Sequence, residues 1–233
     1  EGTLVAEEGK YLPEIKKCDI SSVKGSVIVK DFSKEKFKMN LKSNKVNVIK
    51  ILPGGVVTAK DTAEIELDAN GEFVRNPGVD LVKVAVVERH QGTGNVACGF
   101  LKGYGIKEGA VALSVAHDSH NIIVVGVNDE EMEFAVNSLI EQEGGIVLVK
   151  EGKVIESMPM PIAGLMSDQS GEWVDQKLTD IHEKAYEELG ICGDVEPVMT
   201  LCFMSLAVIP EIKLTDMGLF DVTTFSFIPV EVE

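Results

Sequence analysis

The amino-acid sequence predicts an α/β fold of the mixed α+β kind, in which a layered sheet carries helices packed on it. Three observations predict this class. Apolar runs with the length and β-branched content of strands occur at residues 81–87, 95–101, 109–116 and 121–127. Two longer segments, 128–145 and 172–190, repeat apolar residues at helical spacing. A strand, a helix and a strand follow one another within residues 121–149, which predicts a right-handed parallel βαβ crossover.

The first 80 residues predict short strands, tight turns and one short helical segment. Strands are expected at residues 3–6, 26–29, 45–52 and 56–67, turns at 7–10 and 76–78, and the helical segment at 31–39. Asn70 and Gly71 form a dipeptide that is typical of a tight hairpin.

The four runs between residues 81 and 127 are nearly continuous in apolar side chains, as in strands that are buried on both faces. The helix that follows is expected to begin after Asn128, whose side chain can cap it, with Glu131 in the capping-box position. Its apolar stripe consists of Met132, Val136, Leu139 and Ile140. Gly144 and Gly145 are expected to end the helix before a strand at 146–149.

After residue 149 the sequence predicts a hairpin, an extended segment, a second helix and a tail. The hairpin turns at 150–153 into a strand at 154–158. Residues 159–168 are expected to be extended by two prolines and to end in helix-capping groups at Ser167 and Asp168. The second helix carries an apolar stripe, with His182 beside it at a solvated or boundary position. The tail is expected to supply strands or short helices at 200–210, 212–214 and 225–232.

Composition excludes some partners. Lys and Arg number 22 and Asp and Glu 38, which gives a formal net charge of −16. Such a charge repels nucleic acid and anionic membrane surfaces, so neither is an expected partner. No apolar run reaches the roughly 20 residues of a membrane-spanning helix, and no segment resembles a signal peptide. The chain begins with Glu1 instead of Met, so we expect a piece of a longer protein.

Two polar loops between apolar strands are the candidate functional segments. His117, Asp118 and His120 lie in the stretch AHDSHN, where a turn gains nothing from histidine for its backbone. A carboxylate beside an imidazole can orient it. The stretch VVERHQGTGN ends another strand and contains the candidates Glu88, Arg89, His90 and Thr93. Asn121, the last residue of AHDSHN, is a further candidate. Because ligand sites lie beyond strand ends in α/β sheets, we expect the two loops to form the mouth of one pocket.

The alternative for these loops is a purely structural role, in which the imidazoles bond to backbone carbonyls. No HxH pair occurs among the four histidines, so the sequence predicts no metal site within this chain. The four cysteines are scattered among apolar residues without a CxxC pair, which favours a reducing cytoplasm.

Long motifs in the chain resemble the carboxy-terminal region of bacterial and archaeal adenine deaminases, which belong to the amidohydrolase superfamily. The matching stretches are VERHQGTGNVACGFLKGYGIKEGAVALSVAHDSHNIIVVGVND, MPMPIAGLMSD and TLCFMSLAVIPEIKLTDMGLFDV. Residues 1–30 resemble the last strands of the small β-sandwich that accompanies the superfamily's catalytic barrel. The resemblance therefore implies a domain division into residues 1–30 and 31–233, the latter being the adenine deaminase carboxy-terminal α/β domain.

The resemblance implies hydrolysis of adenine to hypoxanthine and ammonia in purine salvage, with a divalent metal, manganese or iron, in the full-length enzyme. It makes His117, Asp118 and His120 candidates that face the active site, and makes Glu88, Arg89, His90, Thr93 and Asn121 candidates for binding adenine. The motifs of the metal-bearing barrel are not present in this sequence. We therefore expect an upstream barrel domain as partner, no bound metal, no activity of this chain alone, and a cytoplasmic homo-oligomer. The alternative is a non-catalytic module for ligand binding or oligomerisation.

Overall fold

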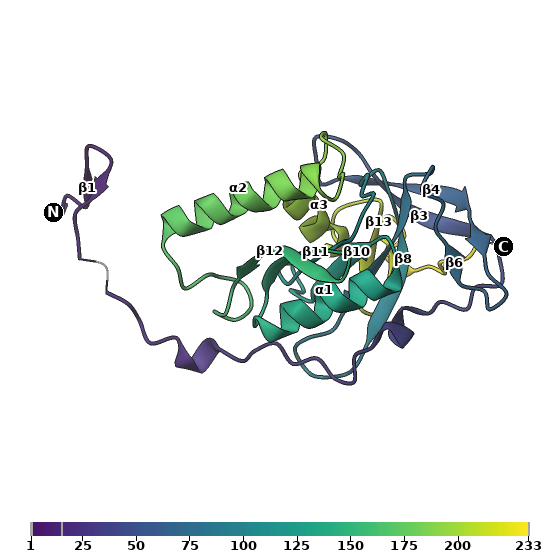
Figure 1. Cartoon of the computed structure of the whole chain (residues 1–233), viewed down its shortest axis with the longest axis horizontal. Coiled ribbons are helices and arrows are strands. Elements are labelled where there is room, and N and C mark those ends of the chain that lie inside the picture. The colour runs from purple at the N-terminus through teal and green to yellow at the C-terminus, as the bar shows by residue number, and fades with distance from the viewer. Residues whose placement is uncertain (1, 15, 233) are drawn as a thin grey trace.

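The structure is a computed structural model that describes residues 2–14 and 16–232. Its body is built on an eight-stranded sheet with helices on both faces, while residues 2–14 lie away from it (Figure 1). The strands of this sheet are, in chain order, β3 (Lys45–Ile51), β4 (Thr58–Glu64), β7 (Leu81–Val87), β8 (Val96–Lys102), β9 (Ala110–Leu113), β10 (Ile122–Gly126), β11 (Gly145–Lys150) and β12 (Lys153–Pro159). The predicted mixed α+β class is confirmed.

The strands lie across the sheet in the order β12-β11-β9-β10-β7-β8-β3-β4. Neighbouring strands are antiparallel, apart from β3 and β8, whose parallel ladder pairs Ile49 with Leu101 and Lys50 with Lys102. By contrast, β3 pairs with β4 along all seven of its residues. The hairpin of β3 and β4 is thus joined to the rest of the sheet through β8 by a much shorter ladder.

The crossover predicted within residues 121–149 is present as β10, helix α1 (Asp129–Glu141) and β11. Both strands are antiparallel to β9, which lies between them, so they run parallel to each other. The Asn128 side chain accepts a hydrogen bond from the N–H of Glu131, as an N-cap residue does. Met132, Val136 and Leu139 of the expected stripe are buried, and Ile140 is partly buried.

Alternate side chains of the central strands point to opposite faces of the sheet. On the face under α1, which we call the α1 face, Val87 belongs to the same buried cluster as Leu139. On the other face, which we call the α2 face, Val86 belongs to a cluster with Ile181 of helix α2 (Gly171–Glu187). Burial on both faces explains why the strand sequences are nearly continuous in apolar residues.

The tail of the chain completes the α2 face. Its elements are α3 (Pro197–Cys202), the 3-10 turn η3 (Phe203–Ser205), β13 (Ile212–Thr215), β14 (Gly218–Asp221) and β15 (Ser226–Phe227). Of the last expected segment, 225–232, only Ser226–Phe227 forms a strand, whereas β14 was not expected. Residues beyond β15 lie along β3, where the N–H of Asn47 donates to the carbonyl of Val230 at 2.7 Å.

The remaining short elements include the hairpin expected at Asn70 and Gly71, formed by β5 (Glu66–Leu67) and β6 (Phe73–Val74). The prediction that residues 159–168 are extended is wrong, because residues 161–166 form turns that are closed by a bridge between Ile162 and Met166. Ser167 and Asp168 do not cap α2. Ser170 does, by accepting from the N–H of Trp173. Among the described residues, no helix is long and apolar enough to cross a membrane.

The N-terminal arm, residues 2–41, begins with the hairpin of β1 (Ala6–Glu7) and β2 (Lys10–Tyr11) and continues through the 3-10 turns η1 (Ser21–Val23) and η2 (Lys34–Phe37). The strand expected at 26–29 is wrong. That segment crosses the α1 face of the sheet, where Val27 and Val29 pack on the buried cluster, and the N–H of Ile28 donates to the carbonyl of Arg89 in the loop after β7. Of the helical segment expected at residues 31–39, Lys34–Phe37 forms the 3-10 turn η2. The predicted division at residues 30 and 31, and the β-sandwich origin of the first segment, stay predictions.

Candidate functional site

Two loops that the sequence singled out lie side by side. The first loop, residues 88–95, follows β7, and the second loop, residues 117–121, precedes β10. Because β7 and β10 are antiparallel neighbours with Val87 opposite Ile122, the two loops leave the sheet at the same end. The Nε2 atom of His90 lies 2.7 Å from the carbonyl oxygen of Ser119. A carbonyl can only accept, so Nε2 carries the proton and donates it across the two loops.

Glu88 organises the first loop from within. One carboxylate oxygen accepts from the N–H groups of His90 (2.5 Å) and Gln91 (2.7 Å), and the other from the N–H and the hydroxyl of Thr93 (both 2.9 Å). Burial alone would raise the pKa of Glu88, but these donors lower it to about 2. Glu88 is therefore ionised at neutral pH and its oxygens are occupied by its own loop.

Arg89 is 1% exposed and joins three segments of the chain. Its Nε donates to the carbonyl of His120 at 2.5 Å, and its Nη2 donates to the carbonyl of Ala163 at 3.2 Å. Its own backbone carbonyl accepts from the N–H of Ile28 in the arm at 2.8 Å. Burial lowers the pKa of this guanidinium from its ordinary value. The contacts of Arg89 hold the second loop, the arm and the turn at residue 163 together.

The second loop presents two imidazoles to each other. The rings of His117 and His120 are 6.0 Å apart between centroids, and the His117 ring packs on Phe203 of η3 at 4.6 Å. The Nδ1 of His117 lies 3.5 Å from a carboxylate oxygen of Asp118, a largely exposed residue. This places the carboxylate where the sequence expected it, beside an imidazole.

His120 is the most constrained member of the second loop. Its backbone has a φ of 53°, in the left-handed region, which costs energy for a residue with a side chain. Its Nδ1 is buried and has no hydrogen-bond partner among the described residues. Burial, followed by the nearby charges of His117 and Arg89, lowers the pKa of His120. The neutral ring is thus favoured, and one ring nitrogen remains unused.

Sequence reasoning did not identify three residues that complete this arrangement, Phe203, Asn95 and Asp216. Phe203 packs under His117, while Asn95 and Asn121 both donate to Asp216. Phe203 and Asp216 lie in the tail, far from the loops along the chain, and no spacing rule connects them. The only signal was their presence in the stretch TLCFMSLAVIPEIKLTDMGLFDV, which carried the family resemblance.

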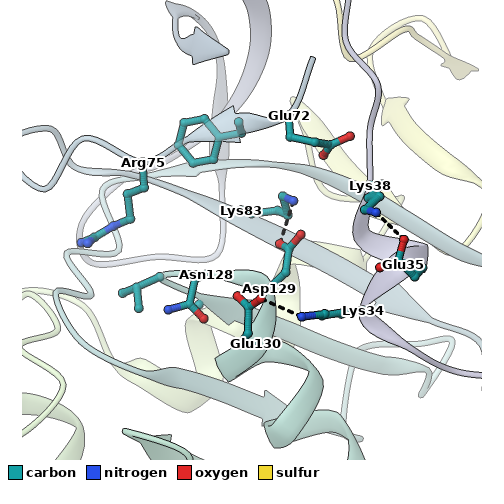
Figure 2. Close-up of a pocket in the computed structure, with 12 residues that line it drawn as sticks. Lys34, Glu35, Lys38, Glu72, Arg75, Lys83, Asn128, Asp129 and Glu130 are labelled. Atoms are coloured by element: carbon teal, nitrogen blue, oxygen red, sulfur yellow. Dashed lines mark hydrogen bonds and ion pairs between the residues drawn. The ribbon is translucent and has the colours of Figure 1, made fainter. Parts of the chain in front are cut away.

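A cavity of about 490 Å³ lies elsewhere, between the arm, the start of α1 and strand β7 (Figure 2). Its lysines are each paired with a carboxylate. Lys83 lies 2.7 Å from Asp129, Lys34 lies 2.8 Å from Glu130, and Lys38 pairs with Glu35. None of the residues that line it belongs to the two loops. The paired charges fasten η2 and the start of α1 around this cavity.

The described residues do not fit the divalent metal that the resemblance implies. They contain no group of three or more His, Cys, Asp and Glu side chains that could hold a metal ion. In the second loop, one imidazole packs on an aromatic ring and the other has a buried nitrogen, which does not provide a converging ligand set. We derive no chemical step through a metal on this chain.

Comparison with known proteins gives a consistent result. A family model described as the adenine deaminase C-terminal domain matches residues 55–226. A protein named adenine deaminase 2 from Desulfotalea psychrophila is 68% identical over 231 residues. An adenine deaminase from Ligilactobacillus salivarius is 47% identical over 232 residues, and adenine deaminase 2 from Carboxydothermus hydrogenoformans is 44% identical over 230 residues. Each alignment covers at least 99% of this chain but 40% of the relative, so the chain spans about two fifths of their length.

Proposed function

The chain belongs to the adenine deaminase C-terminal domain family, and from this premise we propose that it forms the carboxy-terminal portion of an adenine deaminase. The reaction proposed for the whole enzyme is hydrolysis of adenine to hypoxanthine and ammonia. A divalent metal, manganese or iron, is proposed to activate the water on a catalytic domain outside the residues described here.

The proposed task of this chain is to supply one wall of the active site through the two loops. The observation that carries this proposal is their convergence at one end of the sheet, where the His90 ring bonds to Ser119 and buried Arg89 fixes the backbone of His120. A neutral imidazole can donate one hydrogen bond and accept another, as the ring nitrogens and amino group of adenine require. His117, Asp118 and His120 are the proposed residues that face the substrate, with His90 beside them.

The other candidate residues are proposed to act through these. Glu88 and Thr93 are bonded to each other within the first loop, and Arg89 is buried against carbonyl groups. The side-chain oxygen of Asn121 lies 3.3 Å from the N–H of Arg89. These contacts favour a role in holding the loops over a direct contact with adenine.

Exposed apolar side chains around the loops support the proposal that another domain covers this surface. Ile28 is 51% exposed and donates its N–H to Arg89, while Met217 is 66% exposed and lies beside the Asn95 amide. Met166 is 59% exposed near the turn that Arg89 contacts. Exposed apolar side chains that gather on one surface are typical of a region that another part of a protein covers. We propose the upstream catalytic domain as that part.

Further proposals concern the cell and the assembly. All four cysteines are free, which supports a reducing compartment such as the cytoplasm. Burial raises the pKa of Cys98 and of Cys202 to about 12, so these thiols are unreactive. A role in purine salvage and a homo-oligomeric enzyme remain proposals that come from the resemblance.

The test compares two histidines in the longer enzyme that contains this chain. His120→Gln is expected to lower kcat/KM for adenine by at least about 10-fold, because a substrate contact is lost, with little change in Tm. His182→Gln is the matched control, since His182 lies on α2 and bonds to Glu196, away from both loops. Wild-type activity in His120→Gln would contradict an active-site role and would favour the non-catalytic module.

A further inference from the structure

Asp216 connects the two loops from a third element. It lies in the turn between β13 and β14, and its two carboxylate oxygens each accept from a different side-chain amide. The amide of Asn121, in the second loop, donates at 3.2 Å. The amide of Asn95, at the end of the first loop, donates at 3.4 Å. One carboxylate thus bonds to both loops at once.

The two asparagines lead directly to the residues that shape each loop. Asn121 also accepts from the N–H of Arg89, whose guanidinium fixes the His120 carbonyl. Asn95 accepts, at its backbone carbonyl, from the N–H of Glu88 at 3.0 Å. A displacement of Asp216 would therefore reach Glu88 through Asn95, and His120 through Asn121 and Arg89.

The turn that carries Asp216 is held in place by the core. Leu214 of β13 and Leu219 of β14 are buried against strand β8 beside Gly99, where a Cβ atom would lie in ordinary van der Waals contact, 3.5 Å from a methyl carbon of Leu214. The carboxylate therefore projects from a fixed hairpin toward loops that have no regular secondary structure of their own.

We propose that Asp216 is a positioning residue that holds the two loops in the geometry required for the adenine site, an inference that rests on the proposed function. Two donors, the amides of Asn95 and Asn121, require two acceptors. A carboxylate supplies them, whereas a carboxamide supplies one acceptor and sets its own NH2 group against the second donor. Asp216→Asn is therefore a nearly isosteric change that releases one loop.

The first experiment measures hydrogen exchange in the chain itself. Because Asp216→Asn releases one of the two loops, hydrogen exchange is expected to become at least about 5-fold faster in that loop. The amides to follow are those of His90, Gln91 and Thr93 in the first loop and those of residues 117–121 in the second. The matched control is Asp221→Asn, in the same small sheet, whose carboxylate bonds to its own turn at Thr223 and pairs with Lys60. That variant should leave both loops unchanged. Unchanged exchange in Asp216→Asn would overturn the proposal.

The second experiment reverses the polarity of one contact in the longer enzyme. Asn121→Asp places two carboxylates together and should lower kcat for adenine by at least about 5-fold. Combining it with Asp216→Asn restores a carboxamide–carboxylate pair and should recover most of that loss, which a general loss of stability would not do. No recovery in the double variant would overturn the proposal.

Failure of the proposed function gives a different result. In that case His120→Gln would have wild-type activity, and the positioning role in the adenine site would fall with it. If His120→Gln loses activity while Asp216→Asn keeps both its kinetics and its loop exchange, only the inference about Asp216 is contradicted.

Discussion

The Nε atom of Arg89 donates to the carbonyl oxygen of His120 across the two loops, at 2.5 Å. This bond fixes the backbone of a residue that already has the costly φ of 53°. Among the described residues no carboxylate bonds to the buried guanidinium, so its charge is compensated by the two carbonyl dipoles and by the nearby carboxylate of Glu88. Arg89 therefore contributes to the stability of the fold as well as to the shape of the second loop.

Replacing Arg89 should test that contribution. Arg89→Met is expected to lower the free energy of unfolding by about 2–3 kcal/mol, because two buried carbonyls lose a charged donor. Urea unfolding followed by circular dichroism measures the change. Arg75→Met is the matched control: Arg75 also donates to one carbonyl, that of Ile106, but it is only partly buried. Equal losses in both variants would contradict a special role for Arg89.

The low pKa of Glu88 predicts a loss of stability in acid. The pKa of Glu88 is about 2 in the folded protein, compared with an ordinary value of 4.5. The ionised carboxylate therefore stabilises the folded state by about 3 kcal/mol above pH 4.5, and this stabilisation is lost as the pH falls toward 2. Glu88→Gln should remove this dependence and be less stable at pH 7. Unfolding curves of both proteins between pH 3 and 7 should therefore converge toward low pH, and a constant difference would contradict the prediction.

Two buried lysines should respond in opposite ways to replacement. Lys213 is fully buried, and its Nζ donates to the carbonyl of Val56 at 2.9 Å, with no ion pair among the described residues. Burial lowers its pKa to about 8. Below pH 8 the folded protein carries a buried charge, which costs about 3 kcal/mol relative to the neutral amine. Between pH 8 and 10.5 the folded protein has released this proton while the unfolded chain still holds it, so the stability rises with pH in this range.

Lys213→Met is therefore expected to be at least as stable as the wild type at pH 7 and to lose the rise between pH 8 and 10.5. Lys83→Met is the comparison, because Lys83 is also buried but pairs with Asp129. It should lose about 3 kcal/mol, since the change leaves a carboxylate without its partner. Thermal unfolding at several pH values measures both, and a large loss in Lys213→Met at pH 7 would contradict the prediction.

The docking of α1 predicts a core effect at Leu139, a fully buried residue. Leu139→Ala should lower the free energy of unfolding by about 2–5 kcal/mol. Leu4→Ala is the control, because Leu4 lies in the arm and is 63% exposed. Urea unfolding is expected to separate the two variants clearly. A loss at Leu139 within experimental error would mean that the helix does not pack as described.

The chain on its own is predicted not to deaminate adenine, because its described residues provide no converging set of metal ligands. Purified chain with added manganese should leave the ultraviolet absorbance of adenine unchanged over hours. The longer enzyme is the positive control. Sustained, metal-dependent conversion by the chain alone would contradict this prediction.

Much of the fold could be predicted because local patterns control it. The run at 81–87 and the cap at Asn128 are short-range signals, and both lead to the expected elements. The strand at 26–29 was wrong because an apolar run reports burial, and in this segment Val27 and Val29 are partly buried by packing on the face of a sheet instead of pairing within one. The insertion of β9 between β10 and β11 has no local signal at all.

The candidate loops could be predicted because histidine is unusual in a turn, but the residues that hold them could not. Asn121 and Asp216 are 95 positions apart and meet only through the packing of the tail on the α2 face. Glu88 was expected to contact a ligand, since a charged residue at a strand end is ambiguous. Only the structure shows that its oxygens are occupied by its own loop.

The pairing of β3 with β4 has a consequence for where this domain can be cut. The family match begins at residue 55, between these two strands, and stops at residue 226, before the segment that lies along β3. A polypeptide trimmed to the matched residues would leave β4 without its strand neighbour and expose the backbone edge of β8. Such bare edges pair with other chains and aggregate. The sheet therefore extends beyond the matched family region at both ends, because β3 and residues 228–232 pack into it.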